Sequence, residues 1–358
     1  MKRIVCLIDS LCAGGAQRQL TTLGVSLKNA GYEVSFIVYH DIPFFQPVLD
    51  RNGVECTVVK DNGLFSKPGR ILNIAGALRR MKPDVVISYL DSPNVIASLL
   101  KMSGMKFRLV ASDRNTSLNA GTREKMIYSI MRYADVIVPN SVSQTTFLKV
   151  NFPGLAPKIR TIHNFVDTDY FRPDGSARRA GSKRIVCVGR LEPQKNVERF
   201  LEAVSMVRQA FPDFRVDWYG KRYDYYRSYE KRIDELQLSD IFFIHEPVSD
   251  IREKYRESDV LCLPSVFEGY PNVLCEAMSC GLPVICSDVC DNPAIVRDGR
   301  DGILFDPYNP RSMADAMLRF LNMPEEQMLA MGEMCRSRSL ELFDRNAILD
   351  KYISAIEG

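Results

Sequence analysis

The sequence predicts an α/β fold made of two successive parallel-sheet units. Short apolar runs alternate with helical patterns along the 358 residues, which is typical of parallel strands connected by helices. The alternation lapses once, between residues 171 and 184, where Pro, Gly, Ser and Arg are frequent, and it then starts again. A chain of this length has room for two cores. We therefore expect two Rossmann-like units, at residues 1–175 and 176–341, with a cleft between them.

The expected strands of the first unit are runs rich in Val, Ile and Leu. A helical pattern at residues 16–30 follows the first run and stops at Gly31, a residue that commonly ends helices. Residues 67–82 give an amphipathic helix that carries several basic residues. The strands are expected at residues 3–8, 33–39, 54–59, 84–89, 108–111 and 135–138.

The second unit repeats this architecture, and its strands are expected at residues 184–189, 215–219, 241–245, 259–263 and 284–287. Residues 342–358 then read as one amphipathic helix.

The ten cysteines lie mostly inside apolar runs, and none belongs to a Cys-x-x-Cys pair. They are therefore expected to be reduced packing residues, which indicates the cytoplasm and argues against a zinc site. No apolar run approaches the roughly 20 residues that a membrane-spanning helix needs.

The net charge of +3 conceals an asymmetry. Residues 1–175 hold 22 Lys and Arg against 14 Asp and Glu, whereas residues 176–358 hold 25 against 30. The basic residues gather in 67–82, 101–108 and 123–132. This pattern is equally consistent with ordinary solvated helix faces and with docking on a membrane surface or an anionic lipid carrier. No aromatic-basic interleaving or zinc spacing indicates a nucleic-acid partner.

Two carboxylates flank a strand-to-helix turn in the second unit. Glu268 follows the apolar strand 259–263, and Glu276 lies one turn into a helix that starts near Asn272. Burying Glu276 among apolar neighbours is costly unless a partner hydrogen-bonds it, and a ribose diol offers two donors. The amides of 269–274 would open a helix N-terminus, which suits a diphosphate. A lone Glu on a helix is more often solvated, but the combination predicts a nucleotide-sugar site.

Two cations, Arg190 and Lys195, lie between a strand end and the helix that starts near Val197. The helix dipole disfavours cations there unless an anion lies between them and the helix. A diphosphate would supply that anion, and Arg and Lys would stabilise the charge that grows on it as a sugar departs. Either residue alone would be read as part of a solvated loop.

The element from 265 to 281, with two Glu separated by seven residues, resembles that of the retaining GT-B glycosyltransferases of sequence family 4. The resemblance covers nearly the whole chain and is most specific from 184 to 288. It implies two Rossmann-like domains that face each other across a cleft. It also implies that residues 342–358 cross back to pack on the first domain.

The resemblance further implies that Glu276 contacts the donor ribose, that Glu268 lies beside the donor sugar, and that Arg190 and Lys195 contact the diphosphate. The catalytic residues would be Glu268, Arg190, Lys195 and Arg114. The donor-binding residues would be Gly14, Gly15, Gly189, Arg190, Lys195, Gly220, Pro247, Val248, Glu268, Gly269, Tyr270, Pro271, Asn272, Val273, Leu274 and Glu276.

The chain departs from the family pattern after the expected strand 108–111. Many relatives carry a histidine there, whereas this chain has Arg114 and Asn115, which we expect to bind the acceptor or a phosphate. Asp167 and Asp169 resemble a metal-binding D-x-D pair, but their place near the linker favours a structural turn. We expect no metal, and no cofactor besides the substrate nucleotide sugar.

The sequence thus predicts a metal-independent, retaining hexosyltransferase. It would move a hexosyl or N-acetylhexosaminyl group from a nucleotide sugar, with UDP as the expected carrier, to a glycan or polyprenyl-diphosphate-linked oligosaccharide in cell-surface polysaccharide biosynthesis. Its expected location is the cytoplasm, with peripheral contact at the inner face of the plasma membrane. The alternatives are a catalytically silent nucleotide-sugar-binding protein and a GT-B epimerase, the latter disfavoured by the presence of only three histidines.

Overall fold

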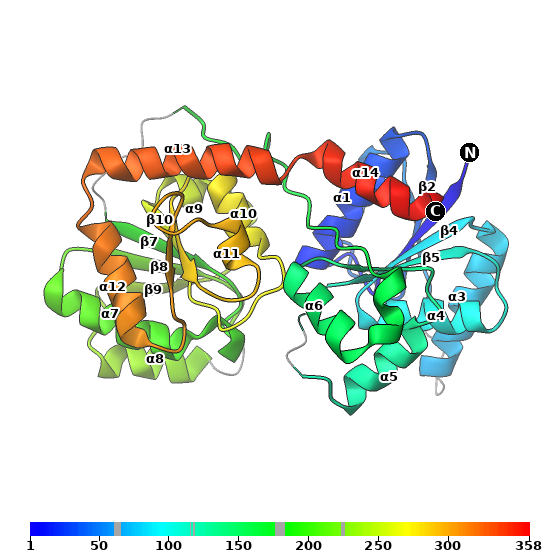
Figure 1. Ribbon diagram of the computed structural model, residues 1–358, viewed down its shortest axis with the longest axis horizontal. Helices are drawn as coiled ribbons and strands as arrows, with labels where there is room; N and C mark the ends of the chain where they lie inside the picture. The colour runs from blue at the N-terminus through cyan, green and yellow to red at the C-terminus, as the bar shows by residue number, and fades with distance from the viewer. Residues whose placement is uncertain (61–65, 115, 117–118, 176–182, 223–225) are drawn as a thin grey trace. The chain divides into compact units, whose positions relative to one another are not determined.

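The computed structural model describes the whole chain except residues 61–65, 115, 117–118, 176–182 and 223–225. The chain divides into two compact units, Met1–Phe165 with Arg345–Gly358, and Val166–Asp344 (Figure 1). The sequence placed these boundaries at 175 and 341. The segment after Phe165 belongs to the second unit because Val166 and Phe171 pack in one of its hydrophobic clusters.

Six parallel strands form the sheet of the first unit, in the order β3-β2-β1-β4-β5-β6. The chain builds outward from β1 to β3 and then adds β4, β5 and β6 on the other side of β1. The strands are β1 (Arg3–Leu7), β2 (Glu33–Val38), β3 (Glu55–Val58), β4 (Val85–Tyr89), β5 (Arg108–Asp113) and β6 (Val136–Pro139). The helices before residue 165 are α1 (Gly15–Asn29), α2 (Gln46–Arg51), α3 (Ser66–Met81), α4 (Asp91–Met102), α5 (Thr122–Met131), α6 (Val142–Asn151) and the 3-10 helix η2 (Pro153–Lys158).

Alternate residues of β1 enter different hydrophobic clusters, as expected for a strand that is covered on both faces. Ile4 and Cys6 pack in one cluster, and Val5 and Leu7 in another. The first cluster includes side chains of the C-terminal helix α14 (Arg345–Glu357), which runs beside α1 (Figure 1). The expected packing of a C-terminal helix on the first unit is confirmed.

The second unit repeats the arrangement with the strand order β12-β11-β10-β7-β8-β9, again all parallel. Its strands are β7 (Arg184–Val188), β8 (Arg215–Tyr219), β9 (Phe242–His245), β10 (Val260–Leu263), β11 (Val284–Ser287) and β12 (Ile303–Phe305). Its helices are η3 (Pro193–Lys195), α7 (Val197–Ala210), α8 (Tyr226–Glu235), α9 (Arg252–Arg256), α10 (Asn272–Ser279), α11 (Asn292–Ile295), α12 (Pro310–Leu321) and α13 (Glu325–Leu342). The two sheets confirm the predicted pair of parallel α/β units.

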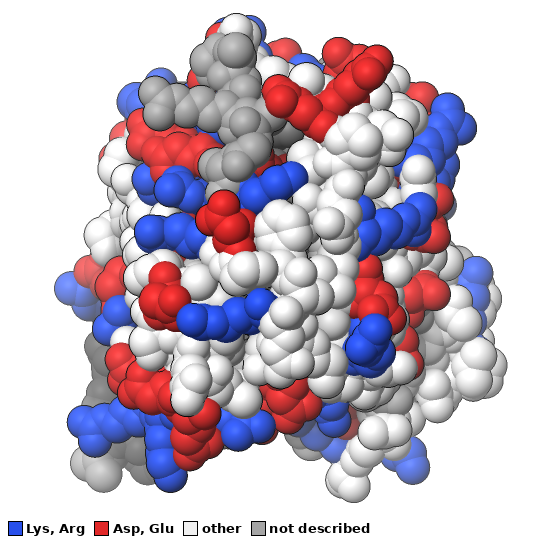
Figure 2. Space-filling view, turned by 90° about the vertical axis from the view of Figure 1, so that its left-hand side faces the viewer, with Lys and Arg blue, Asp and Glu red and all other residues white. Residues whose placement is uncertain are grey.

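All ten cysteines are free thiols, and most are buried. Burial raises the pKa of the Cys56 thiol to about 12 and raises that of Cys275 well above its ordinary value, so both stay protonated at neutral pH. Among the helices that the structure describes, none combines the length and the apolar character needed to cross a bilayer. On the face of the second unit shown in Figure 2, acidic and basic side chains are interspersed.

Candidate nucleotide-sugar site

The sheet of the second unit reverses its direction of growth between β7 and β10. From β7 the chain adds β8 and β9 on one side, and from β10 it adds β11 and β12 on the other, although β7 and β10 are hydrogen-bonded neighbours. Loops that leave the carboxyl ends of two such strands part in opposite directions and leave a crevice that typically binds ligands. The loop with Arg190 and Lys195 follows β7, and the loop with Glu268 follows β10.

Lys195 and Glu268, 73 residues apart in the sequence, form an ion pair at this place. The Lys195 ammonium donates to the Glu268 carboxylate over 2.5 Å, and the two side chains are only 12% and 10% exposed. Removing either partner of an ion pair this well shielded from water would leave the other charge without compensation. The structure therefore brings together two of the predicted catalytic residues.

The neighbours of Lys195 fix the geometry of this pair. The backbone of Asn196 is left-handed, with φ of 58°, a conformation that Asn tolerates better than most residues. Its buried amide donates to the carbonyls of Pro264, over 3.1 Å, and Pro307, over 2.7 Å. The Gln194 amide donates to the Phe267 carbonyl, one residue before Glu268. Sequence reasoning gave no role to Asn196, although its position between a cationic loop and a helix start was a usable signal.

Glu276 lies one turn into α10, as predicted, and is almost fully buried. The Tyr255 hydroxyl lies 3.5 Å from its Oε2 atom. The first intrahelical bond of α10 runs from the Cys275 amide to the Pro271 carbonyl, so residues 272–274 form the first turn of the helix. Along the chain, the first turn of α10 and then Glu276 therefore come a few residues after Glu268.

Two side chains of the predicted donor segment point into the core instead. Tyr270 is buried against Phe343, with ring centroids 6.2 Å apart, and Leu274 packs in the same hydrophobic cluster. Burial raises the pKa of Tyr270 far above its ordinary value, so its hydroxyl stays neutral. Tyr270 and Leu274 could therefore contact a donor only through their main chain, which is the contact that was expected of the amides of 269–274 and stays a prediction.

Arg190 differs from Lys195 because it is largely free to move. Its side chain is 57% exposed, and its ion pair with Glu192, over 3.3 Å, is of the solvated kind that contributes little stability. A guanidinium in this position can turn toward an anion bound at the same loop.

The glycines predicted to approach a donor have a structural reason as well. A Cβ atom on Gly220 would lie 1.8 Å from the Gly189 carbonyl oxygen, and one on Gly189 would lie 2.8 Å from Cε of Lys195. A side chain on Gly220 would therefore push apart the ends of β7 and β8, and one on Gly189 would displace the Lys195 side chain. Pro247 and Val248 follow β9 and are exposed.

A buried carboxylate that sequence reasoning missed lies beside this segment. Asp217 of β8 accepts two hydrogen bonds from Arg215, over 2.8 and 2.7 Å, and contacts Nε2 of His245 at 2.6 Å. The His245 ring stacks on Tyr219, with centroids 4.6 Å apart. Burial raises the pKa of Asp217, but the bonds from Arg215 and His245 outweigh it and hold the pKa below its ordinary value.

Replacing this carboxylate should destabilise the second unit. We expect Asp217→Asn to lower its free energy of unfolding by about 2 kcal/mol at pH 7, because hydrogen bonds to the charge are lost. The folded-state pKa is depressed, so this stabilisation is complete above the ordinary value of 3.8 and disappears as the pH falls through the folded pKa. Urea unfolding followed by the fluorescence of Trp218, the only tryptophan, measures this unit directly.

The matched control for this experiment is Asp213→Asn, because Asp213 is exposed. It should leave the unfolding midpoint almost unchanged. An equal loss in both variants, or a loss for Asp217→Asn that does not shrink as the pH is lowered below 3.8, would contradict this assignment.

In the first unit, Gly14 immediately precedes α1 and Gly15 is the first residue of this helix. Gly14 cannot carry a side chain without displacing Gln17, whose Oε1 atom would lie 2.1 Å from the added Cβ. Gln17 in turn donates to Asp9 over 3.0 Å. The packing of Gln17 therefore explains why a residue without a side chain is needed at position 14.

Arg114 is partly exposed and is held by hydrogen bonds within the first unit. Its guanidinium donates to Oδ1 of Asn164 and to the Tyr89 hydroxyl, each over 2.5 Å, and to the Tyr352 hydroxyl of α14. It also lies over the Tyr89 ring, 4.2 Å from the centroid. Arg114 thus ties α14 to the end of β5, and its expected contact with acceptor or phosphate stays a prediction.

Two remaining expectations concern neighbouring loops. Asn115 lies outside the described residues. Asp167 accepts hydrogen bonds at Oδ1 from the amides of Asp169, over 3.2 Å, and Tyr170, over 2.9 Å. This bonding is typical of an Asx turn, in agreement with the structural interpretation of the D-x-D pair.

Comparisons with known proteins agree with this geometry. Residues 13–170 match the model described as Glycosyltransferase Family 4, and residues 182–323 match Glycosyl transferases group 1. An N-acetylgalactosamine-N,N'-diacetylbacillosaminyl-diphospho-undecaprenol 4-alpha-N-acetylgalactosaminyltransferase of Campylobacter jejuni is 26% identical over 335 residues, which cover 90% of each chain.

A second Campylobacter jejuni enzyme, which adds alpha-1,4-N-acetyl-D-galactosamine to a diphospho-undecaprenol-linked saccharide, is 25% identical over 85% of this chain and 84% of its own. The crystal structure of Anabaena HepE in complex with UDP and glucose matches with a TM-score of 0.88 over the whole of both chains, at 17% identity, and shows that the fold is the same. The two family matches together span most of the sequence, and the chain belongs to the GT-B glycosyltransferases of family 4.

Proposed function

We propose that this glycosyltransferase moves a hexosyl or N-acetylhexosaminyl group from a UDP-sugar to a hydroxyl of a polyprenyl-diphosphate-linked glycan, with retention of configuration. The observation that carries the proposal is the buried Lys195–Glu268 pair at the β7–β10 switch point, followed by the start of α10 and the buried Glu276. The names of the two Campylobacter relatives and the UDP in the Anabaena complex support the donor and acceptor classes.

In this proposal the donor binds to the second unit through charge and hydrogen bonds. Arg190, Lys195 and the amides that start α10 bind the diphosphate, and Glu276 accepts the ribose hydroxyls. The Lys195 ammonium moves from Glu268 to the phosphate oxygens when the donor binds. The Glu268 carboxylate is then available for a sugar hydroxyl and for the positive charge that develops at the anomeric carbon.

The bond changes balance without an external base. The bond from the anomeric carbon to the diphosphate oxygen breaks, and the acceptor oxygen forms a new bond on the same face. The acceptor proton goes to the departing phosphate oxygen, whose charge Lys195 and Arg190 stabilise. Free thiols and the basic charge of residues 1–175 support a cytoplasmic location, with the first unit at the inner face of the plasma membrane.

The stereochemistry tests this proposal. Incubation of the protein with a UDP-sugar labelled with ¹³C at the anomeric carbon and with undecaprenyl-diphosphate-linked saccharide should give a product with the anomeric configuration of the donor. The coupling constant at the anomeric carbon, measured by NMR, distinguishes the two outcomes. An inverted product would refute the front-face mechanism, and a free sugar epimerised at another carbon would instead indicate the epimerase.

Metal removal should have little effect. Because the proposed site would neutralise the diphosphate with two cations and a helix N-terminus, we expect the initial rate in EDTA to stay within about twofold of the rate with Mg²⁺ or Mn²⁺. Loss of activity in EDTA that returns on adding one of these ions would overturn this expectation. In that case Asp167 and Asp169 would become the candidate metal ligands.

A further inference from the structure

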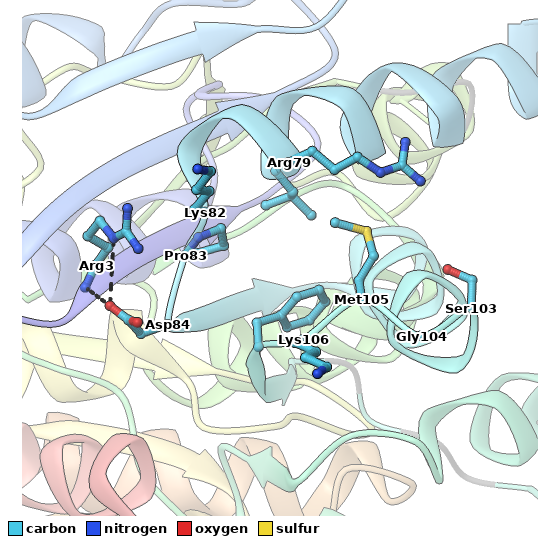
Figure 3. Close-up of a pocket in the computed structure, with 11 residues that line it drawn as sticks. Arg3, Arg79, Lys82, Pro83, Asp84, Ser103, Gly104, Met105 and Lys106 are labelled. Carbon is cyan, nitrogen blue, oxygen red and sulfur yellow. Dashed lines mark hydrogen bonds and ion pairs between the residues drawn. The ribbon is translucent and has the colours of Figure 1, made fainter.

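A cavity of about 520 Å³ opens at the edge of the first sheet where β1, β4 and β5 begin. Three parts of the chain build it: the start of β1 with Arg3, the end of α3 with the turn to Asp84, and the turn from Ser103 to Phe107 between α4 and β5 (Figure 3). The volume lies within the range of small-molecule sites.

The cavity has a strongly basic lining. It contains Arg3, Arg79, Lys82 and Lys106 and a single carboxylate, Asp84, which already accepts a hydrogen bond from the Arg3 amide over 2.7 Å and lies 3.8 Å from Nε of Arg3 (Figure 3). Arg79, Lys82 and Lys106 are exposed and form no ion pair with any residue that the structure describes. Three unneutralised cations around one hollow raise the local concentration of anions.

This basic cavity is separate from the residues of the proposed transfer reaction. Gly14 and Arg114 follow the carboxyl ends of β1 and β5, whereas the cavity lies at the amino ends of these strands. Each of them has five or six residues, so the two edges lie about 16 Å apart at a rise of about 3.3 Å per residue. An anion bound here would not touch those groups.

We propose that the basic cavity binds a phosphate-bearing ligand. Arg79 offers the planar fork of donors that matches two phosphate oxygens, and Lys82 and Lys106 offer point charges from the α3 and α4 sides. Phosphate carries more charge than a carboxylate and gains more from three cations. The same chemistry is present in a soluble phosphorylated compound and in the headgroup of an anionic lipid. This inference does not depend on the proposed transfer reaction.

Met105 provides a site-specific probe because it lines the cavity beside Lys106. We would label the 14 methionines of the full chain with ¹³C-methyl groups, assign the Met105 signal with Met105→Leu, and titrate with sodium pyrophosphate. The Met105 methyl should shift in a saturable manner. The buried Met317 of the second unit serves as a reference for general salt effects.

The test variant is Arg79→Gln/Lys82→Gln/Lys106→Gln. Its matched control is Arg51→Gln/Lys60→Gln/Lys149→Gln, which removes the same charges from three exposed residues elsewhere in the first unit. We expect the test variant to lose at least about tenfold in apparent pyrophosphate affinity, because charge-assisted hydrogen bonds are lost, and the control to bind as the wild type does. The methionine spectrum shows whether each variant is folded.

Vesicles distinguish the source of the phosphate. Sedimentation with phosphatidylglycerol vesicles, compared with phosphatidylcholine alone, should be lost in the test variant and kept in the control if the ligand is a lipid headgroup. Pyrophosphate binding without such sedimentation assigns a soluble ligand. The proposal is overturned if pyrophosphate leaves Met105 unmoved and vesicle binding is absent, or if the test and control variants weaken binding equally.

Discussion

Lys195→Ala should lower kcat by about 10²–10³-fold, the effect of removing one well-placed group that stabilises developing charge in a transition state. In the structure the Lys195 ammonium is held by Glu268 and shielded from water, and a charge in such a place acts more strongly than one in solvent. Initial rates at saturating donor and acceptor measure the change. Lys231→Ala, on the exposed face of α8, is the control and should leave kcat unchanged.

The ion pair raises a second explanation for such a loss. Removing Lys195 also leaves the Glu268 carboxylate buried without its partner, where it would repel a diphosphate. Comparing Glu268→Gln with the double variant Lys195→Ala/Glu268→Gln separates the two explanations. If Lys195 stabilises the leaving group, the double variant is much slower than Glu268→Gln alone. Equal rates for these two variants would mean that Lys195 serves only to neutralise Glu268.

Glu276→Ala should weaken UDP binding by about 100-fold, because two charge-assisted hydrogen bonds from the ribose are lost. The loss should be confined to ligands that carry both hydroxyls. Wild type should therefore prefer UDP to 2′,3′-dideoxy-UDP, and the variant should bind the two equally. Calorimetric titration of both nucleotides into both proteins completes this cycle.

The Tyr255 hydroxyl provides the control for Glu276, because it lies 3.5 Å from the carboxylate and is a neighbour of it rather than a proposed ligand contact. Tyr255→Phe should bind UDP nearly as the wild type does. A Glu276→Ala protein that keeps full affinity for UDP, or one that still prefers UDP to the dideoxy nucleotide, would remove the ribose assignment.

The strands could be predicted from the sequence because a buried parallel strand needs a continuous apolar run, and runs such as 3–8 and 284–287 are unambiguous. β12 was missed because Ile303–Phe305 has only three residues and resembles a turn. The C-terminal helix was predicted to start at residue 342. In the structure α13 ends at Leu342 and α14 starts at Arg345, and no glycine or proline lies between the two helices to mark this boundary in the sequence.

The site was predictable where chemistry and spacing lie in one segment, as for Glu268 and Glu276. It was not predictable where partners are distant in the sequence. The burial of Arg114 against Tyr352 joins residues 238 positions apart, and the bond between Asp217 and His245 joins adjacent strands whose pairing no local pattern reveals. Such contacts follow from strand order and helix packing, which a single sequence does not contain.

Nucleotide binding by the purified protein shows whether the second unit carries a working UDP-sugar site. Purified protein in EDTA would be titrated calorimetrically with UDP, GDP and ADP. The slow release of sugar from the UDP-, GDP- and ADP-sugars would be measured with the same protein. We expect micromolar binding of UDP in preference to the other two nucleotides, together with slow release of sugar. Binding without release, even with lipid-linked saccharide present, would indicate a silent binding protein, and no binding of any nucleotide would show that the second unit has no such site.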